Sequence, residues 1–224
     1  MSAAGSLAIA DDEVATVERA IARVEAATGV QIVAAIVPRS DAYPEIPWRA
    51  FALGASLTGL VALVVDLARP DWLTAQALLV QTLAILGGGA IAALAATRLA
   101  PFARLFLGAR RASVEARQCA ESLFLTRELF ATPRRDAVLM MVSEFEHRVV
   151  IVPDVYCKGK VSTAEWEGVV ARMTPLLRSG KVADAFVAGL ESMETLLAGK
   201  GFAPSTDAAP RNVLADALVR GSSQ

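Results

Sequence analysis

Two long runs without a charged residue, 50–65 and 72–97, most constrain what this chain of 224 residues can fold into. A helix needs about 20 predominantly apolar residues to cross the roughly 30 Å hydrocarbon core of a bilayer. The second run meets that length, and the first meets it when the apolar residues that follow Asp66 are counted. The polar segment 66–71 separates the two runs. The pattern therefore predicts two membrane-crossing helices joined by a short loop.

We expect this helical hairpin to occupy residues 48–100, with helices near 49–68 and 73–97. Hydrophobic residues make up 54% of the chain, which is high for a soluble protein, and the excess lies in this middle part. The alternative is a buried helical hairpin in a soluble protein, although so small a chain has little else with which to cover it. Two prolines are expected to keep the segment just before the hairpin, 42–48, irregular.

Three consecutive glycines, 87–89, lie inside the second apolar run. A phosphate-binding loop is implausible within such a helix. Small residues instead allow two membrane helices to approach closely. We therefore expect the glycines to pack against Gly54, Ser56 or Gly59 of the first helix.

Arginines are concentrated on the two segments that flank the hairpin. Because loops on the cytoplasmic side of a membrane are enriched in Lys and Arg, this bias predicts that both termini are cytoplasmic. The acidic N-terminal segment lacks the apolar core of a cleavable signal, so insertion would depend on the hairpin. The flanking arginines are Arg39, Arg49, Arg98, Arg104, Arg110 and Arg111, whereas the loop holds Arg69.

The residues outside the hairpin show the periodicities of an α/β domain that the hairpin divides into two parts, 1–47 and 101–202. The tail, 203–224, is rich in small and polar residues and is expected to be flexible, with one weak helix at 212–219. The expected helices are 11–28, 112–131, a helix that starts at a Ser162/Glu165 capping box, and 181–198, and the expected strands are 30–37, 137–142 and 147–152.

Strand 30–37 cannot satisfy its backbone groups alone, so it must pair with the strands that follow the hairpin. It is joined to strand 137–142 through helix 112–131, and such a crossover connection predicts parallel pairing. Strands 137–142 and 147–152 form a β-hairpin. The expected fold is an α/β domain with a small mixed sheet flanked by helices, into which a two-helix transmembrane hairpin is inserted.

Three charged residues, Arg135, Asp136 and Asp154, precede one strand of the β-hairpin and follow the other, so they should meet at one end of the sheet. Arginine binds phosphate-like anions, and carboxylate oxygens are ligands for a divalent cation. We therefore treat this cluster as a candidate ligand site. The alternative is a salt bridge that fixes the strand ends.

A second candidate cluster lies at the opposite end of the sheet, where Ser40 and Asp41 follow the first strand and Glu144, Glu146 and His147 surround the β-turn. A histidine beside carboxylates can act as a general base or a metal ligand. More often such a histidine is an exposed turn residue. We expect this end of the sheet to face the membrane, because the chain leaves it to enter the hairpin.

The stretch TPRRDAVLMMVSEFEHRVVIVPD (132–154), followed by a helix that carries Trp166, resembles the TPM domain of the membrane-linked bacterial subgroup. Thr132, Arg135 and Asp154 match the pattern of that family, as does Trp166. Asp136-Ala137 stands where relatives favour Thr-Gly, and Val155-Tyr156 stands where Arg-Gly is common. The resemblance covers roughly 10–47 and 111–202.

This resemblance implies a helix-flanked α/β sandwich in the plasma (inner) membrane of a bacterium. Some relatives have been assigned phosphatase activity or divalent-cation binding, and many bacterial members have no assigned activity. We expect a membrane-anchored interaction or accessory module with a protein partner in the membrane. A divalent-metal-dependent phosphatase is the alternative, and a small transport component is a third possibility.

The net charge of −1 gives no reason to expect a nucleic acid partner. The two cysteines, Cys119 and Cys157, and the single histidine lack the spacing of a zinc site. No P-loop, G-x-S-x-G or H-E-x-x-H motif is present. These features do not identify a cofactor, and a divalent cation is the candidate.

Overall fold

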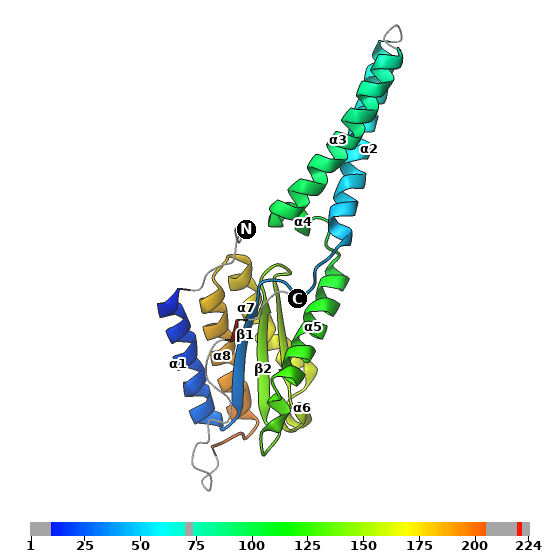
Figure 1. Ribbon diagram of the computed structural model, residues 1–224. Helices are drawn as coiled ribbons and strands as arrows, with labels where there is room; N and C mark the ends of the chain where they lie inside the picture. Colours follow the sequence, from blue (N-terminus) through cyan, green and yellow to red (C-terminus); the bar gives the residue numbers. More distant parts are fainter. Residues whose placement is uncertain (1–9, 70–73, 205–218, 221–224) are drawn as a thin grey trace. The chain divides into compact units, whose positions relative to one another are not determined.

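The computed structural model of the chain describes residues 10–69, 74–204 and 219–220 (Figure 1). These residues form two compact units. The hairpin unit contains residues 42–109, and the α/β unit contains residues 10–41 together with the described residues from 110 onward. The chain therefore passes from the α/β unit into the hairpin unit and back.

The hairpin unit consists of α2 (Glu45–Ala68), α3 (Ala75–Arg98) and the short α4 (Ala100–Arg104). Helix α2 begins before the expected start and includes Pro47, so the prediction that prolines keep segment 42–48 irregular holds for 42–44 and is wrong for 45–48. The N–H groups of a first helical turn have no intrahelical acceptor, and a proline there removes no hydrogen bond.

Helices α2 and α3 pack closely at glycines, as the sequence predicts. A Cβ atom added to Gly54 would lie 2.6 Å from both the Ala92 Cβ and the Gly88 carbonyl oxygen, which is too close for any larger residue. A Cβ atom added to Gly87, in contrast, would meet nothing within 4 Å. The close approach to α2 therefore involves Gly88 but not Gly87.

The α/β unit contains a mixed sheet with strand order β3-β2-β1-β4. Strand β1 pairs in parallel with β2, with Gln31 opposite Ala137, and β2 pairs antiparallel with β3. Both pairings were predicted from the chain order, and they confirm a small mixed sheet in a helix-flanked α/β fold. The strands are β1 (Gln31–Val37), β2 (Ala137–Ser143), β3 (Arg148–Pro153) and β4 (Val219–Arg220).

Strand β4 corrects part of the prediction for the C-terminal tail. The predicted helix 212–219 falls almost entirely on residues outside the described part of the chain, as does most of the flexible tail. However, Val219 and Arg220 pair in parallel with Ala35 and Ile36 of β1. The edge of a sheet presents unpaired backbone groups, and a two-residue segment that satisfies them has no periodicity to detect in the sequence.

Helices cover both faces of the sheet (Figure 1). Ile32, Ala34 and Ile36 of β1 pack with α1 (Asp11–Thr28), α7 (Thr163–Arg178) and α8 (Val182–Gly199). The alternate residues of β1 pack with α5 (Ala109–Thr126) on the other face. Burial on both faces explains why strand β1 reads as a continuous apolar run.

The helix before β2 and the segment after β3 differ from the prediction. The helix expected over 112–131 is α5 followed by a separate 3-10 turn at Leu129–Ala131, because Glu128 adopts a left-handed backbone conformation with φ of +52°. A short helix, α6 (Val155–Lys160), follows β3 and was not expected. The capping box of α7 is confirmed, since the Glu165 carboxylate accepts a hydrogen bond from the Ser162 N–H.

Candidate functional site

The β2–β3 hairpin brings Arg135 and Asp154 together at one end of the sheet, as the sequence predicts. The Asp154 N–H donates to the Ala137 carbonyl at 2.8 Å, which fixes the end of β3 beside the start of β2. The Arg135 Nε donates to Asp154 Oδ2 at 2.8 Å, and its Nη2 donates to Oδ1 at 3.0 Å. This bidentate geometry is the strong form of an arginine–carboxylate pair. It raises the pKa of Arg135 above its ordinary value.

Asp136 takes part in a separate ion pair. Its Oδ2 accepts from Arg134 Nε at 2.8 Å, and Arg134 Nη2 also donates to the Gly29 carbonyl at 3.0 Å. Sequence reasoning missed Arg134, because nothing in the Arg134-Arg135 dipeptide shows which guanidinium reaches which carboxylate. Together the two ion pairs form what we call the double-arginine site (Arg134, Arg135, Asp136 and Asp154).

Burial divides the double-arginine site into a hidden acidic part and an accessible basic part. The side chains of Asp136 and Asp154 are 5% and 3% exposed, whereas those of Arg134 and Arg135 are 44% and 51% exposed. The buried carboxylates are thus neutralised by their arginines, as the salt-bridge alternative describes. The surface presents guanidinium groups, which favour an anion over a cation.

The backbone of this site also depends on Arg135 and Asp154. Arg135 has a φ of +54°, in the left-handed region that larger residues adopt rarely. Its carbonyl accepts a hydrogen bond from the Tyr156 N–H at 3.1 Å, which ties this strained residue to α6. Asp154 is the N-cap of α6 and accepts from the Val155 N–H at 2.7 Å.

At the opposite end of the sheet, Ser40, Ser143 and Glu146 form a hydrogen-bonded chain that we call the turn clamp. The Ser40 N–H donates to Glu146 Oε1 at 2.9 Å, and the Ser40 and Ser143 hydroxyls are 2.7 Å apart. The Ser143 hydroxyl donates to the other oxygen of Glu146. The carboxylate partner of Ser143 is thus only three residues further along the chain.

The turn clamp is a closed arrangement. Ser143 is fully buried and Glu146 is 7% exposed, so neither group is open to a substrate. The clamp holds the segment after β1 against the β2–β3 turn. This is a structural role for two residues of the second predicted cluster.

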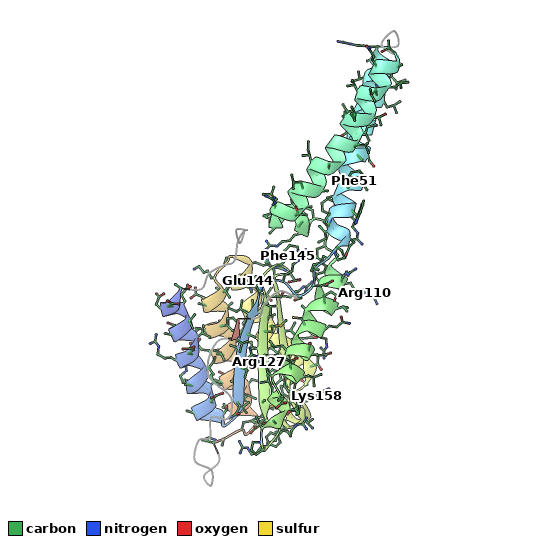
Figure 2. All side chains as sticks on the ribbon, viewed as in Figure 1. Phe51, Arg110, Arg127, Glu144, Phe145 and Lys158 are labelled. Atoms are coloured by element: carbon green, nitrogen blue, oxygen red, sulfur yellow. The ribbon has the colours of Figure 1, made fainter. Side chains whose placement is uncertain are left out.

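The remaining residues of the second predicted cluster lie around the same turn. The Glu144 N–H donates to the Val37 carbonyl at 3.0 Å, which continues the pairing of β2 with β1, and Figure 2 shows Glu144 and Phe145 at this end of the strands. His147 has a φ of +49° and donates its N–H to the Glu144 carbonyl at 3.3 Å. Asp41 instead forms an ion pair with Arg111 at 3.2 Å.

Cys119 of α5 lies beside the turn clamp, and sequence reasoning did not place it there. Burial raises the pKa of its thiol, the nearby Glu146 carboxylate raises it further, and a hydrogen bond with Ser40 opposes both effects. A raised pKa keeps the thiol protonated at neutral pH and lowers its reactivity. Cys119 is therefore a neighbour of the clamp rather than an activated nucleophile.

Within the described ranges, no group of three or more His, Cys, Asp and Glu side chains is arranged to hold a metal ion. The double-arginine site offers guanidinium groups to an anion, and the turn clamp fixes backbone. The described chain is thus a helix-flanked α/β unit with an inserted apolar hairpin, in which the more accessible of the two predicted clusters exposes guanidinium groups that are paired with buried carboxylates.

No protein-family model matches this sequence, and no curated protein sequence matches it. Among solved structures, the chain is similar to the NMR structure of BA42 protein from the psychrophilic bacterium Bizionia argentinensis. The TM-score is 0.58 at 14% sequence identity, over 99% of this chain and 100% of that one. At this identity the likeness concerns the fold alone.

Proposed function

We propose that this protein is an integral membrane protein whose α/β unit serves as an interaction or accessory module at the cytoplasmic face of a bacterial plasma membrane. The observation that carries the proposal is the surface of the hairpin unit. Helices α2 and α3 have 24 residues each, and the most apolar stretch of 18 residues in each helix has a mean hydropathy of 2.0. At 1.5 Å per residue, each reaches about 36 Å, enough for a bilayer core.

The exposure of these helices supports a membrane setting over a buried core. Only 11% of the most apolar stretch of each helix is buried. Large side chains such as Leu60 and Leu83 are 58% and 61% exposed. A soluble monomer rarely exposes contiguous apolar surface of more than a few hundred Å². Lipid tails would cover this surface on every side that the two helices do not cover for each other.

The proposed orientation rests on the distribution of arginines. Arg49 lies near the start of α2 and Arg98 at the end of α3, whereas Arg69 lies just after α2 at the other end of the hairpin. Arg39, Arg110 and Arg111 add to the flanking group in the sequence. The positive-inside rule then favours a cytoplasmic α/β unit.

The double-arginine site supports binding as the role of the α/β unit. Its exposed groups are cationic, and the exposed Lys158 and Lys160 of α6 extend the positive surface. An acidic segment of a membrane protein would complement this surface. We also propose that the unit is TPM-like, because Thr132, Arg135, Asp154 and Trp166 match that family and the fold is a helix-flanked mixed sheet.

A divalent-metal-dependent phosphatase is the second candidate, and the clustering of Arg135 with two carboxylates favours it. Both carboxylates are buried and paired with arginines, which argues for an accessory role instead. We expect the detergent-purified chain to show no phosphatase turnover above background with Mg²⁺ or Mn²⁺. Metal-dependent activity that disappears in both Arg135→Ala and Asp154→Ala would establish the second candidate.

Alkaline carbonate extraction and reporter fusions test the membrane proposal. The intact chain should remain in the membrane pellet, and a variant lacking residues 45–98 should be released. A reporter enzyme that works only outside the cytoplasm should be active when it is inserted after Arg69. A reporter that works only in the cytoplasm should be active when it is fused to the C-terminus. A cytoplasmic signal after Arg69 would refute the orientation, and release of the intact chain would refute membrane insertion.

A further inference from the structure

We infer that one end of the hairpin unit binds the phosphate groups of anionic phospholipids. This end, which we call the collar, consists of Trp48, Arg49, Arg98, Leu99 and Leu105. The inference rests on the proposed insertion of α2 and α3 in a membrane, and it adds a lipid class as a specific partner.

The packing of the two helices brings the two arginines of the collar to the same level. Gly54 of α2 lies against Ala92 of α3. Arg49 precedes Gly54 by five residues, and Arg98 follows Ala92 by six residues, in helices that run in opposite directions. At 1.5 Å per residue, both arginines lie roughly 8 to 9 Å along the helices from that contact, on the same side of it.

The collar combines exposed cations with exposed apolar side chains. Trp48, Leu99 and Leu105 are 73%, 56% and 78% exposed, and Arg49 and Arg98 are also exposed. Tryptophan is enriched where a membrane protein meets the headgroup region, because its ring is apolar and its N–H is polar. A surface with both cationic and apolar side chains is better suited to the boundary between acyl chains and phosphates than to bulk water or the hydrocarbon core.

Arg49 is held in place by the chain segment that follows α4. Its Nη1 donates to the Phe106 carbonyl at 2.9 Å, and the Phe106 ring packs edge-on against Phe102 with 5.3 Å between centroids. A guanidinium has five N–H donors, so this bond leaves donors for a ligand. Arginine binds phosphate oxygens through two parallel hydrogen bonds, and a fixed guanidinium loses less freedom on doing so.

The other end of the hairpin differs in charge and contacts. Gln81 of α3 donates a hydrogen bond to Asp66 of α2, which places a carboxylate in that region, and Arg69 follows α2. Anionic lipids attract basic residues at the membrane surface and should repel a carboxylate. The collar end also holds one carboxylate, that of Glu45 in the first turn of α2, but Arg49, Arg98 and Arg104 outnumber it. The charge difference between the two ends therefore assigns anionic headgroups to the collar.

Lipid retention by the full-length protein tests this inference. The chain is reconstituted in vesicles of phosphatidylcholine and phosphatidylglycerol at 4:1, washed with carbonate, extracted in a mild non-ionic detergent and purified. Mass spectrometry then gives the ratio of the two retained lipids. We expect the protein to enrich phosphatidylglycerol several-fold over the vesicle composition, and Arg49→Gln/Arg98→Gln to lower that enrichment roughly fivefold or more.

Arg69→Gln is the matched control, because it removes one exposed cation from the other end of the same hairpin. It should retain most of the enrichment, and 0.5 M NaCl during extraction should reduce the enrichment of the unmodified chain. Equal retention of both lipids, or equal losses in the control and the double variant, would overturn the inference while leaving membrane insertion intact. Loss of the chain in the carbonate wash would instead refute the proposed function and the inference with it.

Discussion

Asp154 has two functions at the level of single residues. Its carboxylate is paired with Arg135 by two hydrogen bonds, and it caps the first turn of α6 through the Val155 N–H. The side chain is 3% exposed, so water cannot replace either interaction. Substitutions at this position can separate the cap from the ion pair.

We expect Asp154→Ala to lower the free energy of unfolding by about 1–3 kcal/mol, because both the cap and the ion pair are lost. Asp154→Asn should have a smaller effect, since an asparagine also caps helices well. Urea denaturation of the full chain in detergent, followed by circular dichroism, measures this. The exposed Asp184 serves as the control, and Asp184→Ala should change stability by less than about 0.5 kcal/mol. Equal effects of the two alanine variants would contradict the prediction.

Glu165 should make stability depend on pH in the acidic range. Hydrogen bonds from Lys200 (2.7 Å between Nζ and Oε1) and from the backbone and hydroxyl of Ser162 lower the pKa of Glu165 from 4.5 to about 2. Because the pKa is lower in the folded state, the stabilisation is complete above about pH 4.5 and is lost as pH falls from there towards 2.

The melting temperature of Glu165→Gln should therefore lie below that of the unmodified protein at pH 7, and the difference should shrink as pH falls below about 4.5 and be lost as pH falls through about 2. Differential scanning fluorimetry across this range measures both. Glu167→Gln, on the same helix and exposed, is the control and should show no such convergence. A difference that stays constant down to pH 2 would refute this assignment.

The two cysteines should differ in reactivity. Burial raises the pKa of Cys157 to about 12, and its thiol lies 3.6 Å from the Asp136 carbonyl. Cys119 is half-buried. At pH 7.5 a maleimide should modify Cys119 more than tenfold faster than Cys157, as peptide mass spectrometry would show, because both access and thiolate content favour it. The rates should become similar in urea, and similar rates in the folded protein would contradict the prediction.

Sequence reasoning placed the charged residues at the right ends of the sheet but did not identify their partners. The juxtaposition of Arg135 with Asp154 follows from the β-hairpin, which hydrophobic patterning reveals. The pairing of Asp136 with Arg134 does not follow from the sequence, because Arg134 and Arg135 differ in side-chain direction rather than in chemistry. The Ser143–Glu146 bond was also missed, since a three-residue separation across a turn has no signature in the sequence.

At the level of elements, the contact between α2 and α3 permits a direct comparison of two glycines in similar surroundings. Gly54→Ala should lower the melting temperature of the full chain in detergent, because the new Cβ would lie 2.6 Å from the Ala92 Cβ and the Gly88 carbonyl oxygen. Gly87→Ala should leave it unchanged or slightly raised, because there is open space at Gly87 and alanine favours helix. A lower melting temperature for Gly87→Ala than for Gly54→Ala would show that the helices pack through another face.

Elements with a strong local signal were predicted well, and elements that depend on distant partners were not. The apolar runs, the capping box of α7 and the strand that becomes β1 follow from periodicity and turn residues. The early start of α2 depends on how a proline is tolerated in a first turn. Strand β4 forms because the edge of β1 has backbone groups with which it can pair. That edge exists only in the assembled sheet, so the residues Val219 and Arg220 alone do not predict the strand.

At the level of the whole molecule, the hairpin unit is an insertion that leaves the α/β unit continuous. The chain leaves the α/β unit at Asp41 and re-enters it at Arg110. Asp41 is ion-paired with Arg111 at 3.2 Å, so the points of exit and return lie together. The proposed pair of membrane crossings fits this closure, because a single crossing would leave the two parts of the sheet on opposite sides.

This interrupted sheet also has a consequence for the order of events during synthesis. Val37 ends β1 and Ala137 begins β2, so 100 positions of chain must be translated between the two neighbours. At elongation rates of roughly 5–20 residues per second, β1 waits about 5–20 s for its partner. The hairpin emerges from the ribosome within that interval. The pairing of β1 with β2 can therefore begin only after both apolar helices have been synthesised, and until then this edge of β1 is open to capture by chaperones or proteases.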